Sequence, residues 1–214
     1  MSGADDDYRY RGAAYQGAPG AFSEDAARLL VDSDGPLLPC RALEDVFHAL
    51  TAGRVRYAVV PIENSIAGAV PGVDELMKRY RVQAVGDVTI RIAQTLIGLP
   101  GARVERLQRV LSHPVALAQC SRFLSCHSNL DAVSTFDTAG AVAEILAIAD
   151  PASAAIASER AAEQLGAAVL LREIQDCPDN FTRFVKLRRA KEKSTKHEGH
   201  EEEHALHALH GLCS

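Results

Sequence analysis

Short apolar runs alternate with segments of helical apolar spacing along almost the whole chain. Extended segments are expected at 11–17, 37–41, 57–62, 82–90, 91–99, 107–112, 131–135, 153–158, 167–174 and 181–189. Helices are expected at 23–31, 42–53, 73–80, 114–124, 137–149 and 159–165. Strands that alternate with helices form βαβ units. The pattern therefore predicts an α/β fold with a mostly parallel sheet.

Several residues mark the ends of these segments. Ser23 is a candidate N-cap, and Pro114 suits the first turn of a helix, where a missing N–H does no harm. Gly53 suits a helix end. Gly86-Asp87 is interpreted as a turn between extended runs.

The composition of the chain changes after Arg189, and residues 190–214 are expected to form a charged, His-rich tail outside the core. Four histidines of the tail lie at helical spacing: His197, His200, His204 and His207. They permit a metal-binding stripe. The alternatives are a solvated or disordered tail, or an amphipathic helix that packs Leu206, Leu209 and Leu212 on a partner.

Composition narrows the class of protein. The chain has 214 residues with 47% hydrophobic content, which suffices for one or two domains. A net charge of −5 argues against nucleic acid or an anionic membrane as a partner. No apolar run is long enough to span a membrane, and the acidic N-terminus resembles neither a secretory signal nor a transit peptide. The five cysteines show no CxxC spacing, which favours reduced thiols and a cytoplasmic location.

The first strand is followed by a Gly-rich loop. Its candidate ligand-binding residues are Gly17, Ala18, Pro19, Gly20, Ala21 and Ser23. Glycines permit close backbone approach, and free N–H groups at a helix start can hold an anion. A tight connector explains the same residues equally well.

Polar residues also follow later strands, where ligands bind in open α/β sheets. After 57–62 come Glu63, Asn64 and Ser65, which could serve a site or merely cap a helix. Glu63 could be a buried acid or base, or a structural ion-pair partner.

Four further polar positions belong to the second half of the chain. After 107–111 come Ser112 and His113, with Gln119 on the next helix. His113 precedes a helix-initiating proline, which favours capping over catalysis. Thr135 ends another expected strand.

The stretch Asn180-Phe181-Thr182-Arg183-Phe184 begins the last strand. With the other strand ends it offers neutral donors and one carboxylate. No nucleophilic triad, P-loop, GxGxxG or catalytic lysine accompanies them. Such a site suits a small polar anion, with mild acid catalysis or positioning.

The ordered segments resemble the catalytic domain of prephenate dehydratases and the related arogenate dehydratases. The matching pieces are YQGAPGAFSEDAA, VVPIENSIAG, SHPVALAQC, STFDTAGA, AAIAS, AAEQLG and IQDCPDNFTRFV, within residues 10–188. Their common order makes the resemblance specific, with NFTRF the most telling piece.

The resemblance implies a two-lobed fold like a type II periplasmic binding protein, with the active site in the cleft. It implies conversion of prephenate to phenylpyruvate, CO2 and water, on the route to phenylalanine. By motif match, the catalytic candidates are Thr182, Asn64, Ser112, Gln119 and Glu63. Further substrate-binding candidates are the six residues of the first loop with Ser65, Thr135, Phe181, Arg183 and Phe184.

Two residues depart from the family pattern. Ala21 stands where the family often has Thr, and Gln94 stands where it often has His in I-x-H-x-L. We also expect no C-terminal ACT domain, because only about 25 residues follow the core. That would mean an enzyme without phenylalanine feedback through such a domain, or a truncated product.

The chemistry requires a donor for the departing hydroxyl oxygen while the ring carboxylate leaves as CO2. Thr182 would be that donor, between phenylalanines that wall a dry pocket. Arg183 lies on the opposite face by strand alternation, which favours a structural ion pair. No metal or other cofactor is required.

Two other functions stay open. The substrate could be arogenate, or the chain could be a non-catalytic small-anion binding protein. We expect one lobe from 8–86 with 166–189 and a second from 87–165, and the family suggests a homodimer or tetramer.

Overall fold

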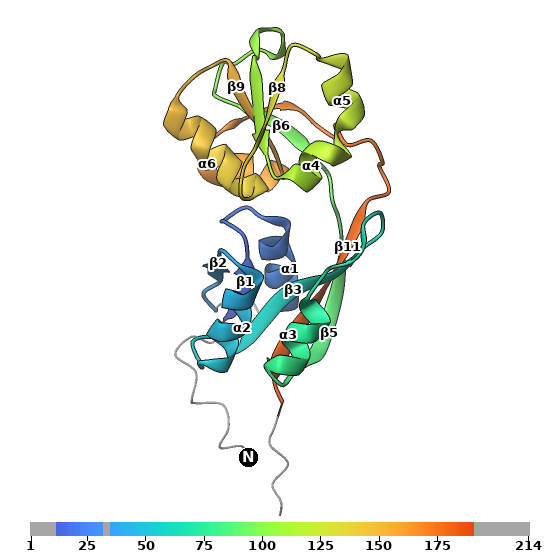
Figure 1. Ribbon diagram of the computed structural model, residues 1–214. Helices are drawn as coiled ribbons and strands as arrows, with labels where there is room; N and C mark the ends of the chain where they lie inside the picture. Colours follow the sequence, from blue (N-terminus) through green and yellow to red (C-terminus); the bar gives the residue numbers. More distant parts are fainter. Residues whose placement is uncertain (1–11, 32–34, 191–214) are drawn as a thin grey trace, which may run out of the picture.

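The computed structural model describes residues 12–31 and 35–190. They form two α/β lobes, one above the other in Figure 1, each built on one sheet. The first lobe contains β1 (Ala13–Gln16), α1 (Phe22–Leu30), β2 (Leu38–Cys40), α2 (Leu43–Thr51), β3 (Tyr57–Asn64), β4 (Gly68–Ala69), α3 (Val73–Arg79), β5 (Val82–Arg91) and β11 (Phe181–Arg189). The second contains β6 (Thr95–Gly98), η1 (Val104–Arg106), β7 (Arg109–Ser112), α4 (Pro114–Gln119), α5 (Ser121–Cys126), β8 (Asp131–Ser134), α6 (Thr138–Ile148), β9 (Ser153–Ala157), α7 (Glu159–Leu165) and β10 (Ala168–Leu171).

The two sheets have matching topologies. The first has the order β2-β1-β3-β11-β5, with β4 beside β3, and the second has β10-β6-β9-β7-β8. β1 is parallel to β2 and β3, and β7 is parallel to β8 and β9. The strand that enters each sheet from the other lobe, β11 or β6, is antiparallel to both of its neighbours. The sheets are therefore mixed, and the expectation of a mostly parallel sheet is wrong.

The chain crosses between the lobes twice, at 92–94 and 172–180. The crossings pair with each other: Ile92 N–H donates to Asn180 O (2.7 Å), and Ile174 N–H donates to Gln94 O (3.0 Å). This is the two-lobed, type II periplasmic-binding-protein-like arrangement expected. The crossings lie later than the expected boundaries, because β5 belongs wholly to the first sheet and β10 completes the second sheet beside β6.

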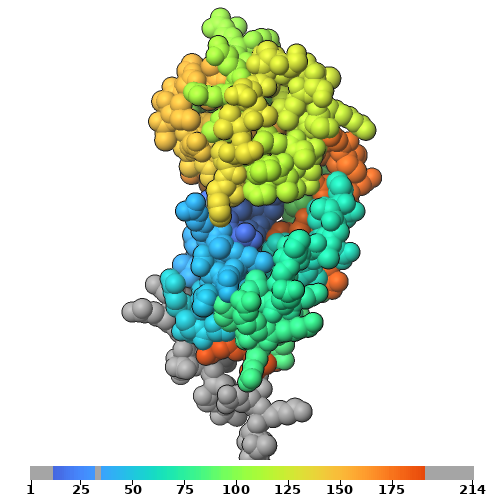
Figure 2. Space-filling model, viewed as in Figure 1, coloured from blue at the N-terminus to red at the C-terminus, as the bar shows by residue number. Residues whose placement is uncertain are grey.

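Apolar side chains fill both faces of each sheet. In the first lobe, Phe47 and Leu50 of α2 pack with Val60 on one face, and Tyr15 and Phe184 pack beneath α1 on the other. In the second lobe, α6 and α7 cover one face and α4 the other. The faces are thus occupied by helices, and a recess lies between the lobes on the side shown in Figure 2. The strand ends that face this recess are where a site can form.

Two expected boundaries are wrong. Gly86-Asp87 makes no turn, because both residues lie inside β5, where β11 pairs with them along a continuous ladder. The helix expected at 114–124 divides at Cys120 into α4 and α5. The carboxylate of Asp176 accepts the N–H groups of Ser121 (3.1 Å) and Arg122 (2.9 Å), so α5 has a start of its own.

The interpretations of the tail concern residues outside the described part, apart from Ala190. Within residues 12–31 and 35–190, no three His, Cys, Asp or Glu side chains gather as a metal site. None of the helices described there has the length and apolarity needed to cross a membrane.

Candidate functional site

Thr182 lies near the start of β11, opposite Asn64 of β3 and Ile90 of β5. Its side chain is only 8% exposed. Asn64 Nδ2 donates to Thr182 Oγ1 at 2.9 Å. Because the hydroxyl oxygen accepts this bond, its proton can be donated elsewhere. The structure thus brings together two of the predicted catalytic residues and leaves the threonine as a donor.

Asn64 is itself held firmly. Its Oδ1 accepts the backbone N–H groups of Ile66 (3.0 Å) and Ala67 (2.9 Å). Its Nδ2 lies 2.7 Å from Asn180 Oδ1 and 3.1 Å from Phe181 O. The loop after β3 therefore fixes which end of the Asn64 amide faces Thr182.

The hydrogen bonds of Ser65 give it a structural role in place of the predicted ligand-binding role. Its hydroxyl donates to Asp179 O (3.2 Å) and accepts from Phe181 N–H (2.9 Å). Its own N–H donates to Phe181 O at 2.8 Å. Ser65 therefore ties the β3 loop to the start of β11.

Glu63, Arg183 and Phe181 lie on the other face of the sheet from Thr182. Glu63 pairs with Arg183 in the ladder, one residue on from the Asn64–Thr182 pair, and neighbouring residues of a strand point to opposite faces. Arg183 Nε lies 3.1 Å from Asp87 Oδ2, as expected of a structural ion pair. The structure does not support the assignment of these three residues to the site.

Phe184 is on the same side as Thr182 but is buried in the core with Tyr15 and Val59. It supports the strand from below and does not line the recess. The expectation that both phenylalanines wall a pocket is therefore wrong.

In the second lobe, Ser112 is fully buried and its hydroxyl donates to Ile156 O at 2.6 Å. Its expected donation to a ligand is taken by this neighbouring strand. His113 Nδ1 accepts Val115 N–H at 3.2 Å, so His113 caps α4, as favoured above. Thr135 Oγ1 donates to Asp137 O at 3.2 Å, within its own loop.

Gln119 ends α4, and its Oε1 accepts from Gln94 Nε2 at 3.2 Å. Its own Nε2 is then oriented away from Gln94 as a donor. Gln94 is 3% exposed, and its backbone N–H donates to Gln175 Oε1 at 2.9 Å. The sequence marks Gln94 only as a departure from the family pattern, and its contact with Gln119 becomes evident from its position on the first crossing.

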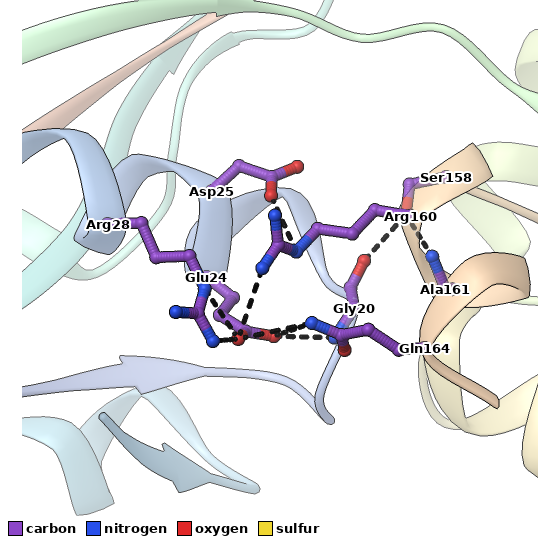
Figure 3. Close-up of polar contacts among 8 residues, drawn as sticks. All are labelled: Gly20, Glu24, Asp25, Arg28, Ser158, Arg160, Ala161 and Gln164. Carbon is purple, nitrogen blue, oxygen red and sulfur yellow. Dashed lines mark hydrogen bonds and ion pairs between the residues drawn. The ribbon is translucent and has the colours of Figure 1, made fainter. Parts of the chain in front are cut away.

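The first loop joins the two lobes. Gly20 O accepts from the Ser158 hydroxyl at 2.6 Å, and Gly20 N–H donates to Glu24 Oε2 at 2.6 Å (Figure 3). Ala18 and Ala21 pack against the apolar cluster of the second lobe. Pro19 is exposed at the turn.

The remaining polar groups of this loop are largely used within the protein. Gly17 N–H donates to Cys40 O at 2.8 Å, and the Ser23 hydroxyl donates to Gln16 O. The N-cap of α1 is Ala21 and not Ser23. Of the two interpretations of the loop, the connector is the one the structure supports.

Charged side chains surround Glu24 at this junction. Arg28 of α1 and Gln164 of α7 donate hydrogen bonds to its carboxylate (Figure 3). Arg160 of α7 lies between two carboxylates: its Nη2 is 3.9 Å from Glu24 Oε1, and its Nε is 3.1 Å from Asp25 Oδ1. Burial alone raises the pKa of Glu24, but the Gly20 N–H and the Arg28 guanidinium outweigh burial and hold this pKa below its ordinary value. Burial raises the pKa of the adjacent Asp25.

The lowered pKa of Glu24 predicts a pH-dependent stability. A carboxyl whose pKa is lower in the folded state stabilises the fold above its unfolded pKa and loses that effect as the pH falls through the folded pKa. Wild type should therefore have a higher thermal midpoint than Glu24→Gln at neutral pH, and the difference should shrink below about pH 4.5, the ordinary value for this group. Midpoints of both proteins across the acid range provide the measurement.

Glu44→Gln is the matched control for that series. It removes an exposed ion pair with Arg79, and such pairs contribute little. Its effect on the midpoint should be small at every pH. A Glu24→Gln difference that is unchanged in acid would contradict the assigned charge effect.

The site and fold together define a class: a two-lobed α/β protein with neutral hydrogen-bonding side chains at the strand ends between its lobes. Comparisons with known proteins then give the family. The profile described as "PDT: Prephenate dehydratase" matches residues 13–192. The chain belongs to the prephenate dehydratase family.

Individual relatives agree. "Arogenate dehydratase 1" of Petunia hybrida is 42% identical over 177 residues, covering 82% of this chain and 42% of that protein. The structure of a prephenate dehydratase from Arthrobacter aurescens in complex with L-Phe has a TM-score of 0.74 at 31% identity, covering 84% of this chain and 60% of that one. A structure titled "GqqA- a novel type of quorum quenching acylases" has a TM-score of 0.76 at 34% identity, covering 86% and 66%. The chain spans less than half the length of the Petunia relative.

Proposed function

We propose that this chain catalyses the decarboxylative dehydration of prephenate to phenylpyruvate, CO2 and water. The observation that carries the proposal is the Thr182 hydroxyl, whose oxygen accepts from Asn64 and whose proton is available to a substrate. It lies in the NFTRF segment of a chain of the prephenate dehydratase family. The arogenate dehydratase name of the Petunia relative makes arogenate the second candidate substrate.

Prephenate is a dianion, and its conversion takes up one proton and releases water and CO2 as the ring becomes aromatic. The barrier is the departure of the ring hydroxyl. A hydrogen bond from Thr182 to that oxygen would stabilise the negative charge that develops as the C–O bond lengthens. The ring carboxylate loses CO2, and its electron pair completes the aromatic ring. Gln119, oriented by Gln94, would hold a polar group of the substrate from the other lobe.

Arg41 supplies positive charge where the two lobes approach each other. It follows β2 in the first lobe, and its guanidinium carbon lies 4.5 Å from the ring centroid of Phe136, which follows β8 in the second lobe. A cation between the lobes favours entry of a dianion.

Acyl transfer, suggested by the acylase title, has less support. The Ser112 hydroxyl donates to Ile156 O, and His113 accepts from Val115 N–H, so neither forms a nucleophile–base pair. Burial raises the pKa of Cys40, and raises that of Cys120 to about 12, so these thiols stay protonated at neutral pH.

The test is turnover by the purified chain. Prephenate is supplied and phenylpyruvate is followed by its absorbance in base, with arogenate in parallel and phenylalanine as the measured product. We expect phenylpyruvate formation, with the higher kcat/KM for prephenate. Turnover of arogenate alone would reassign the substrate, and turnover of neither would contradict the proposal and favour an anion-binding protein.

Two further properties remain predictions. We propose a homodimer or tetramer, which light scattering on the purified chain would test.

We also propose a cytoplasmic location, which fractionation of the source cells would test.

A further inference from the structure

Asn180 immediately precedes β11 and has no exposed surface. Its Oδ1 accepts from Asn64 Nδ2 at 2.7 Å, the shortest of the contacts of that nitrogen. Its backbone O accepts from Ile92 N–H at 2.7 Å. Asn180 thus joins both crossings to the residue that contacts Thr182.

The side-chain nitrogen of Asn180 has no hydrogen-bond partner among the described residues. Buried polar groups are nearly always paired, and an unpaired one destabilises the fold. An apolar side chain of the same size would avoid this unpaired donor. The unpaired nitrogen therefore gives no reason for an amide at position 180, and the reason lies in what the side-chain oxygen does.

That oxygen acts on the amide of Asn64. The nitrogen of Asn64 carries two protons but has three acceptors within 3.1 Å: Asn180 Oδ1, Phe181 O and Thr182 Oγ1. If the amide were free to tilt, the Thr182 hydroxyl could turn its proton toward Phe181 O or Asn180 Oδ1. Asn180 holds one of the two protons and leaves the other directed at Thr182.

We propose that Asn180 is a positioning residue: through Asn64 it keeps the Thr182 oxygen an acceptor, so that the threonine proton is directed at the substrate. This inference rests on the proposed function. It adds a residue that was not among the candidate site residues, acting through two hydrogen bonds on the Thr182 oxygen.

Asn180→Leu and a double-mutant cycle with Thr182→Val test the proposal. Asn180→Leu should lower kcat for prephenate about tenfold, close to the effect of one ordinary hydrogen bond. KM should stay within about twofold, since only an interaction of the transition state changes. The thermal midpoint should be unchanged or higher, because the unpaired donor is removed.

The cycle distinguishes positioning from structure. If Asn180 acts only through the threonine proton, adding Asn180→Leu to Thr182→Val should cause no further loss of kcat. A loss that multiplies with that of Thr182→Val would overturn the proposal, as would an unchanged kcat or a lowered midpoint in the single variant. Wild type measured alongside separates the two claims: if it turns over prephenate, a failed cycle counts against Asn180 alone, and if it turns over neither substrate, both claims fall.

Discussion

Thr182→Val should lower kcat for prephenate by about 10²–10³-fold, the usual loss when one donor to a developing oxyanion is removed. Valine has the shape of threonine without the hydroxyl, so packing beside Asn64 and Ile90 is retained. Asn64 Nδ2 keeps Asn180 Oδ1 and Phe181 O as acceptors, so no buried donor loses all its partners. KM should change little, because the lost bond strengthens mainly in the transition state. Steady-state kinetics with a thermal midpoint on the same preparation provide the measurement.

Two variants serve as controls for Thr182→Val. Thr182→Ser keeps the hydroxyl and should retain most of the activity. Glu63→Gln changes the residue beside Asn64 that faces the opposite side of the sheet, and should leave kcat within about twofold. A large loss in Glu63→Gln would restore Glu63 to the site, and an active Thr182→Val would remove the hydroxyl from the mechanism.

The fold was largely predictable because the apolar patterns are local. Buried strands such as Tyr57–Asn64 and amphipathic helices such as Leu43–Thr51 are evident from the residues alone. The mixed sheets were not, because the direction of β11 depends on where the chain re-enters the first lobe. The same partner strand explains why Gly86 lies inside β5, since a ladder along its whole length outweighs a local turn preference.

The sequence places Thr182 and Asn64 in one candidate site, and the structure brings these two residues into contact, but other positions were less predictable. Which face of a strand a residue occupies follows from register, so Glu63 could not be separated from Asn64 before β3 and β11 were paired. The sequence leaves Ser112 free to donate to a ligand, because only the position of β9 shows that its hydroxyl donates to Ile156 O. Asn180 is the first residue of NFTRF, but the sequence does not indicate its role. That role depends on its contact with Asn64, which is 116 residues away in sequence.

The function of the loop 17–23 could also not be decided from the sequence alone. Its glycines were consistent with an anion cradle or a connector, and only the second lobe decides between them. At Gly20 an added Cβ would lie 2.6 Å from Ala161 Cα and 2.9 Å from Ala161 Cβ. The absence of a side chain at this position is what allows the loop before α1 to lie against Ala161 of α7.

Gly20→Ala should therefore destabilise the protein and disturb the recess together. The backbone of Gly20 has φ +92, which costs an L-residue about 1–2 kcal/mol, and overpacking against α7 adds about 1–3 kcal/mol. We expect a total loss of about 3 kcal/mol in the free energy of unfolding. Because this contact joins the two lobes, a change in it should alter their spacing, and kcat/KM should fall by about tenfold or more. Denaturant unfolding and steady-state kinetics measure the two effects.

Gly101→Ala separates the contact from the backbone strain. Gly101 has a similar φ of +85, but an added Cβ there has no atom within 4 Å. It lies beyond the end of β6 that is remote from the crossing, so this variant should lose about 1–2 kcal/mol of stability and keep wild-type kcat/KM. If the two variants lose the same stability and both keep full activity, the Gly20–Ala161 contact does not set the geometry of the site. A loss of kcat/KM confined to Gly20→Ala would tie the proposed chemistry at Thr182 to the distance between the lobes.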